Sequence, residues 1–133
     1  MNIPRRALTT LLLALAITAC DENVLIGPGN QLEVTNVADE FSFQLTALDN
    51  VTDSRGYMWE NTGTQATIDV SQSITGGSAL ITVRDADGTV MYAVDAADDS
   101  DTTTDAGVAG TWSIDIDMVE TSGEFVLRVQ RTN

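Results

Sequence analysis

Apolar and polar residues alternate along most of the chain after residue 30, which is the pattern of β-strands with one buried face. The clearest case is residues 40–48, where Phe41, Phe43 and Leu45 alternate with serine, glutamine and threonine. The same period of two recurs in short segments at residues 31–36, 57–59, 66–71, 79–83, 90–94, 112–118 and 125–129. This pattern predicts about eight antiparallel strands, and no segment of the domain has the period of a helix.

Turn signals separate these segments every 8–14 residues. Asp87-Gly88 predicts a β-hairpin because both residues tolerate positive φ. Clusters of glycine and short polar residues predict further turns, at residues 49–56, 61–63, 76–77 and 122–123. Residues 95–110 are expected to form a long acidic loop. We therefore expect an all-β fold, a jelly-roll-like antiparallel β-sandwich over residues 31–133. Its core is expected to contain the large aromatic side chains of Phe41, Phe43, Trp59, Trp112 and Phe125.

The first 20 residues follow a different pattern. Arg5 and Arg6 precede an apolar stretch at residues 7–17, which only two threonines interrupt, and Cys20 is the only cysteine. This order is typical of a secretory signal peptide, which is removed and takes no part in the fold. Residues 7–19 are fewer than the roughly 20 that a membrane-spanning helix needs, so a transmembrane anchor is not favoured.

The end of this stretch, Ile17-Thr18-Ala19-Cys20, resembles the lipobox of bacterial lipoproteins. The resemblance implies that residues 1–19 are cut off, and that Cys20 is diacylated and becomes the new N-terminus. It also implies attachment to a membrane of the bacterial cell envelope through these acyl chains. Residues 20–30 contain Gly27-Pro28-Gly29 and are expected to form a flexible tether between Cys20 and the sandwich.

The C-terminal half carries a second resemblance. Gly110-Thr111-Trp112 is followed by Gly123 and by Phe125, Leu127 and Val129 in alternation, and residues 76–130 share this rhythm with small bacterial sandwich modules. These are the pre-peptidase C-terminal domains and the P-domains of subtilisin-like proteases. The resemblance implies a non-catalytic unit for interaction or surface display, here without the protease that such a module usually accompanies.

Charge narrows the range of partners. Removal of residues 1–19 would leave four arginines against 20 acidic residues, a side-chain net charge of −16. Such a domain repels the phosphates of nucleic acids, which are therefore excluded as partners. It also repels anionic lipid surfaces, so attachment to a membrane must come from the acyl chains. The remaining expected partner is another protein of the envelope.

Residue types also limit catalysis. The chain has no histidine and no lysine, and its single thiol is assigned to lipidation. Catalytic triads and Cys–His pairs are therefore excluded, and we expect no enzyme activity and no organic cofactor. Only a carboxylate-based hydrolase remains as a distant alternative, with Asp115 and Asp117 on one strand face. On a wet face, alternating aspartates are ordinarily solvated surface.

Calcium is the better-motivated ligand. Residues 95–105 hold five carboxylates among threonine and serine, and hard cations bind such oxygens. The candidate calcium ligands are Asp98, Asp99, Asp101 and Asp105, although the segment lacks the glycine and terminal glutamate of an EF-hand loop. The alternative is a self-repelling acidic loop without a ligand. Asp85 and Asp87 form a weaker candidate, since Asp87-Gly88 is already explained as a turn.

A carbohydrate site would need exposed aromatic side chains, whereas Trp59 and Trp112 occupy alternating apolar positions and are expected in the core. The sequence thus favours a lipid-anchored, non-enzymatic β-sandwich lipoprotein of the cell envelope, with a structural or protein-interaction role. A calcium- or carbohydrate-binding module is the main alternative.

Overall fold

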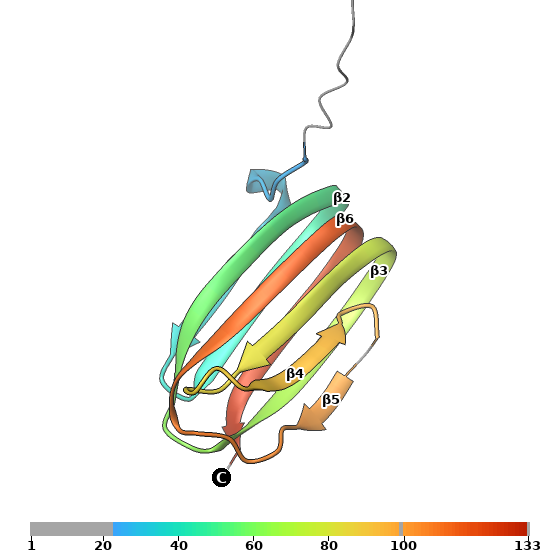
Figure 1. The fold of residues 1–133 in the computed structure, drawn as a ribbon. Helices are drawn as coiled ribbons and strands as arrows, with labels where there is room; N and C mark the ends of the chain where they lie inside the picture. The colour runs from blue at the N-terminus through green and yellow to red at the C-terminus, as the bar shows by residue number, and fades with distance from the viewer. Residues whose placement is uncertain (1–22, 99, 133) are drawn as a thin grey trace, which may run out of the picture.

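The computed structural model describes residues 23–98 and 100–132, which form six strands and one short 3-10 helix (Figure 1). The elements are η1 (Pro28–Asn30), β1 (Glu33–Val37), β2 (Glu40–Asn61), β3 (Gln65–Arg84), β4 (Val90–Asp95), β5 (Ser100–Thr103) and β6 (Gly110–Thr132). All strand pairs are antiparallel, in the order β1-β2-β6-β3-β4, and β5 pairs with β3. Within these residues, no helix is long and apolar enough to cross a membrane.

Three strands are long enough to serve two layers. β2, β3 and β6 have 22, 20 and 23 residues, and each turns over at one end of the molecule (Figure 1). The β1 layer contains β1, residues 40–48 of β2, residues 121–132 of β6, residues 65–74 of β3, and β5. The β4 layer contains residues 51–61 of β2, residues 110–119 of β6, residues 78–84 of β3, and β4. The expected antiparallel β-sandwich is confirmed.

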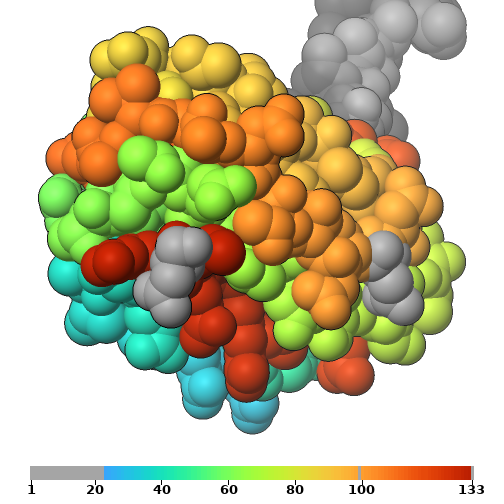
Figure 2. Space-filling model, turned by 90° about the horizontal axis from the view of Figure 1, so that it is seen from below, coloured from blue at the N-terminus to red at the C-terminus, as the bar shows by residue number. Residues whose placement is uncertain are grey.

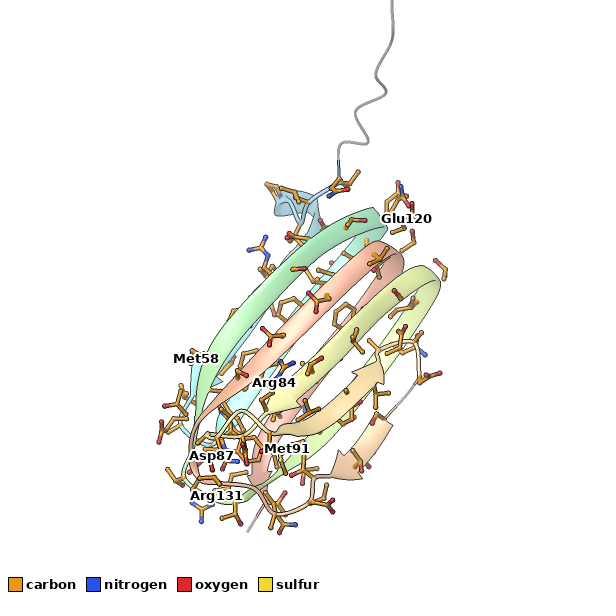
Figure 3. The ribbon with its side chains drawn as sticks, in the orientation of Figure 1. Met58, Arg84, Asp87, Met91, Glu120 and Arg131 are labelled. Atoms are coloured by element: carbon orange, nitrogen blue, oxygen red, sulfur yellow. The ribbon has the colours of Figure 1, made fainter. Side chains whose placement is uncertain are left out.

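The strands turn over at what we call the bent end, formed by residues 47–52, 74–78 and 119–123. Register shifts interrupt the pairing of β2 with β6 and of β3 with β6 there. Five residues at the bent end have positive φ, namely Ala47, Asn50, Gly77, Glu120 and Gly123. Such bulges place an extra residue on one strand and sharpen its bend. The opposite end, which we call the loop end, holds the turns at residues 38–39, 62–64 and 85–89 and the segment 104–109. Figure 3 shows Glu120 at the bent end and Asp87 and Arg131 at the loop end.

The bent end corrects three sequence predictions. The turns expected at residues 49–56, 76–77 and 122–123 are wrong, because these residues lie inside β2, β3 and β6. They do change the direction of the chain, but by bending a strand from one layer into the other.

Two other turn predictions are confirmed, at residues 61–63 and at Asp87-Gly88. In the second, only Gly88 has positive φ, and its amide donates a 3.0 Å hydrogen bond to the Asp85 carbonyl. The long loop expected at residues 95–110 is wrong in part, because it contains β5.

The core lies between the two layers and contains all five predicted aromatic residues, each no more than 1% exposed. Trp59 and Trp112 meet edge to face, with ring centroids 6.0 Å apart. Their indole N–H groups donate to the carbonyls of Val37 and Val108, at 3.1 and 2.8 Å, so that neither polar atom is buried without a partner. Figure 2 looks onto the loop end, where the turn after β2 (green), the segment before β6 (orange) and the end of β6 (red) cover this face.

Candidate functional site

The N-terminal segment is attached to the bent end. Cys20 lies outside the described residues, but from Val24 onward the chain packs on the body. Val24 forms a parallel bridge with Val51, and the Thr52 amide donates a 2.9 Å hydrogen bond to the Val24 carbonyl. The Ile26 amide donates to Oδ2 of Asp53 at 3.1 Å. Residues 24–30, expected to belong to a flexible tether, are therefore a packed segment.

Asp53 is one polar contact of this segment with β2. Its side chain is only 14% exposed, and the same Oδ2 accepts hydrogen bonds from Arg55, at 3.3 Å from Nε and 3.0 Å from Nη2. A carboxylate removed from water needs such compensation for its charge. Asp53 thus connects the N-terminal segment to a guanidinium on the edge of β2.

Asn30 is the second contact. Oδ1 of Asn30 accepts from the Gly27 amide at 2.9 Å, which closes the turn of η1. Its Nδ2 donates to the carbonyls of Thr46 and Ala47, at 3.2 and 3.0 Å. Because Ala47 has positive φ, Asn30 satisfies backbone carbonyls at the point where β2 begins to bend. Both contacts hold the N-terminal segment at the bent end, where the described part of the chain begins (Figure 1).

The predicted calcium ligands lie on three different pieces of backbone. Asp98 ends a turn in which its amide donates to the Asp95 carbonyl at 3.0 Å, Asp101 lies on β5 opposite Asp69, and Asp105 follows β5. The fourth candidate, Asp99, is outside the described residues. Among the residues that the structure describes, no three acidic or cysteine side chains are grouped so that they could hold a metal ion. The calcium prediction therefore gains no support from the described residues.

Asp85 has a structural role. It is 5% exposed, and its Oδ1 accepts from the amides of Asp87 and Thr89, at 3.0 and 2.9 Å. Its Oδ2 accepts from the Val108 amide at 3.0 Å. The carboxylate thus fixes the turn between β3 and β4 and ties it to the segment before β6. Sequence reasoning missed this role, although aspartate at the start of a turn commonly accepts a hydrogen bond from the amide two residues on.

Asp115 and Asp117 share the outer face of the β4 layer, as predicted from their spacing. Oδ2 of Asp115 lies 3.1 Å from Nη1 of Arg84 on the neighbouring strand, and both side chains are 40% exposed. Asp117 is exposed opposite Leu80. This arrangement is a surface ion pair beside a solvated aspartate, and exposed pairs of this kind add little stability.

The aromatic residues offer little to a carbohydrate ligand. Trp59 and Trp112 are fully buried, as expected, and half-buried Tyr57 packs against Phe41 and Phe43 with ring centroids 5.3 and 5.9 Å apart. A shallow groove of about 260 Å³ crosses the outer face of the β1 layer. Its walls carry amide, hydroxyl and carboxylate groups, among them Gln44, Ser71 and Glu124.

No family model matches the sequence, and no curated protein is similar to it. Among solved structures, a chain described as "CBM4 structure and function" aligns over 79% of this chain and 81% of its own length. The identity is 15% and the TM-score is 0.40. At this level the likeness gives no information on what the present chain binds. The fold is assigned from the strand pairing within this chain.

Proposed function

We propose that this protein is a lipid-anchored, non-enzymatic module of the bacterial cell envelope that serves protein interactions. In this proposal the acyl chains on Cys20 hold the bent end near the membrane, and the loop end points away from it. The observation that carries the proposal is the packing of residues 24–30 on the bent end, which begins four positions after Cys20, the last of the lipobox-like residues 17–20.

The length of the connection supports this orientation. Only three residues lie between Cys20 and Val24, and the four steps from Cys20 to Val24 reach at most about 14 Å even when fully extended. The acidic body cannot approach an anionic surface through its own charge, so the acyl chains must supply the attachment. A body held at one end by so short a connection presents its other end to the surroundings.

The proposal that the protein is not an enzyme is based on its residue types and on the contacts of its carboxylates. The sequence has no histidine and no lysine. Two of the notable carboxylates are engaged, Asp85 by three backbone amides and Asp115 by Arg84. The calcium and carbohydrate alternatives have less support, since the candidate ligands are dispersed over the described residues and both tryptophans are buried.

Acylation is tested by growing bacteria that express the full chain with an alkyne-bearing fatty acid and then detecting the label on the protein. We expect the wild-type chain to be labelled and recovered with membranes. Cys20→Ser is expected to lose the label, whereas Asn23→Ala, just outside the lipobox-like residues, keeps it. An unlabelled wild-type chain, or Cys20→Ser recovered equally with membranes, would contradict lipid anchoring.

Orientation is tested by energy transfer in phosphatidylcholine vesicles whose headgroups carry an acceptor dye. A donor dye is placed on Thr75→Cys at the bent end or on Asp87→Cys at the loop end; both positions are exposed. Residues 78–84 of β3 alone span roughly 23 Å, so the two donors should differ clearly in transfer efficiency. We expect stronger transfer from position 75. Equal transfer would contradict the orientation and leave the anchoring result standing.

A further inference from the structure

The two long sides of the sandwich are closed differently. On the side of β1, Ile26 and Leu32 from the N-terminal part pack against the core. There Nδ2 of Asn36 also bonds the Met58 carbonyl at 2.9 Å, across the gap between the layers. On the other side, β4 and β5 are the outermost strands of their layers, and within the described residues each pairs only with β3. One edge of each is therefore without a strand partner in the part of the chain that the structure describes.

A groove of about 450 Å³ lies between these two edge strands. Met91 and Val94 of β4 and Ser100 and Thr102 of β5 line it, together with Tyr92. Figure 1 shows β4 and β5 along the same side of the molecule, and Figure 3 labels Met91 on β4. The groove therefore combines apolar walls, hydroxyl groups and two strand edges.

Tyr92 is the unusual residue of this groove. It is 7% exposed, yet its hydroxyl has no hydrogen-bond partner among the described residues. Burial raises the pKa of this phenol, and the nearby Ser100 hydroxyl opposes that effect. Ser100 lies close to the phenol but does not form a hydrogen bond of normal geometry with it. Buried polar groups are nearly always paired, so a ligand that enters between β4 and β5 and reaches this oxygen, which has almost no exposed surface, would complete its pairing.

The rim of the groove is acidic. Asp105 follows β5 and lines the groove, and Asp98 precedes β5 close enough to the Tyr92 phenol for its charge to raise the phenol's pKa; both aspartates are exposed. The sequence has no lysine or arginine from residue 85 to residue 127. Asp101, Asp69 and Arg128 form one cross-strand row on the outer face of the β1 layer, outside the groove. The charge of this rim is therefore complementary to a cation.

We propose that the groove between β4 and β5 binds an extended, lysine- or arginine-bearing segment of a partner protein. The backbone of the segment pairs with the edge of β4, as in other cases of strand addition. A basic side chain faces the aspartates beside β5, and a polar group of the segment bonds the Tyr92 hydroxyl. This inference rests on the proposed interaction function and names the chemistry of the partner.

The test uses the full chain, ¹⁵N-labelled and purified in a zwitterionic detergent, so that it does not depend on acylation. The probe is a ten-residue peptide of alternating lysine and threonine, and the matched control peptide replaces lysine by glutamate. We expect saturable amide shifts centred on residues 90–95 and 100–103 with the basic peptide only. Shifts spread over the whole acidic surface, or shifts confined to the outer face of the β1 layer, would overturn the proposal.

Variants of the protein test separately how Tyr92 and the aspartates contribute to peptide binding. Tyr92→Phe should weaken binding at least fivefold, whereas Tyr57→Phe, on the opposite side of the sandwich, should leave the affinity unchanged. Asp98→Asn combined with Asp105→Asn should weaken binding further and flatten its dependence on salt. Spermidine serves as a cation without a peptide backbone. Binding of spermidine as tight as that of the peptide, or an unchanged affinity in Tyr92→Phe, would refute strand addition at this groove.

Discussion

Gly77 of β3 lies directly against the backbone of Glu120 of β6, at the point where both strands bend. A Cβ on Gly77 would overlap the carbonyl oxygens of Glu120 and Val119, and its φ of 71° lies in the left-handed region. Only glycine combines this conformation with so close an approach of two backbones. The sharp turn between the layers therefore depends on the absence of a side chain at this position.

Gly77→Ala should lower the free energy of unfolding by at least about 2 kcal/mol, because left-handed strain and a backbone clash add together. Urea titration monitored by tryptophan fluorescence measures the change. Gly29→Ala is the matched control, since a Cβ at Gly29 meets nothing within 4 Å and its φ is not positive. Equal stability of the two variants would show that the bend tolerates a side chain.

The contact between Asp53 and Ile26 predicts a local effect. Asp53→Ala removes the acceptor of the Ile26 amide, and hydrogen bonds to charged groups contribute about 1.5–3 kcal/mol. Hydrogen exchange at Ile26 should become roughly tenfold faster or more, while exchange in the core strands changes much less. Asp49→Ala, an exposed substitution on the same strand, should leave Ile26 protected. Unchanged exchange at Ile26 in Asp53→Ala would mean that the segment is held by its other contacts.

The hydrogen bonds of Asp39 predict that the free energy of unfolding depends on pH. The Thr62 amide and hydroxyl donate to its carboxylate, at 2.8 Å from the amide, and together with Arg131 they hold its pKa below the ordinary value of 3.8. Because the folded-state pKa is lowered, the stabilisation is complete above about pH 4 and is lost as the pH falls through the lowered pKa.

Thr62→Val keeps the amide of residue 62 but removes the hydroxyl. The pKa of Asp39, followed by carboxyl NMR, should therefore rise toward 3.8, and acid unfolding should begin at a higher pH. Arg131→Gln should raise this pKa less, since the Thr62 contacts are the larger cause. A pKa that does not move in Thr62→Val would exclude the hydroxyl as a cause of the shift.

Removal of the buried hydroxyls of Tyr92 and Thr121 should have opposite effects on the free energy of unfolding. Tyr92→Phe removes a group without a partner among the described residues, so the free energy of unfolding should stay the same or rise by up to about 1 kcal/mol. Thr121→Val removes a hydroxyl that donates to the Ser78 carbonyl at 2.6 Å, and should cost about 1–3 kcal/mol. Urea titrations of both variants provide the comparison. A large loss of stability in Tyr92→Phe would reveal a partner for the phenol and remove the basis for the groove as a binding site.

The alternation of apolar residues was sufficient to predict the sandwich and its aromatic core. It did not distinguish a hairpin turn from a bend within a strand. Gly76-Gly77 and Ser122-Gly123 permit positive φ in either case. The outcome depends on the partner strand, because β6 pairs with β3 on both sides of Gly77. Such long-range pairing leaves no local pattern in the sequence.

The candidate sites were harder to predict for a similar reason. Residues 100–103 have no apolar alternation, and they form β5 because residues 67–70 of β3 offer an edge. The packed state of the N-terminal segment depends on Asn30 and Asp53, which contact residues far from them in sequence. The missing partner of the Tyr92 hydroxyl is likewise a property of the assembled layers. Residue types alone could predict the acidic character of the β5 region, but not the groove beside it.

The central place of β6 has a consequence for the order in which the protein folds. β6 lies between β2 and β3 in both layers, and Glu40 near the start of the domain pairs with Gln130 near its end. If the chain is exported N-terminus first, as the proposed function requires, this strand crosses the membrane last. Until β6 arrives, β2 and β3 have no common neighbour, so neither layer can be completed. Folding then has to join the most distant parts of the chain, which is slow in all-β proteins and takes milliseconds to seconds. A protein held at its first residue would spend that interval close to the membrane, with its apolar strands exposed to whatever lies there.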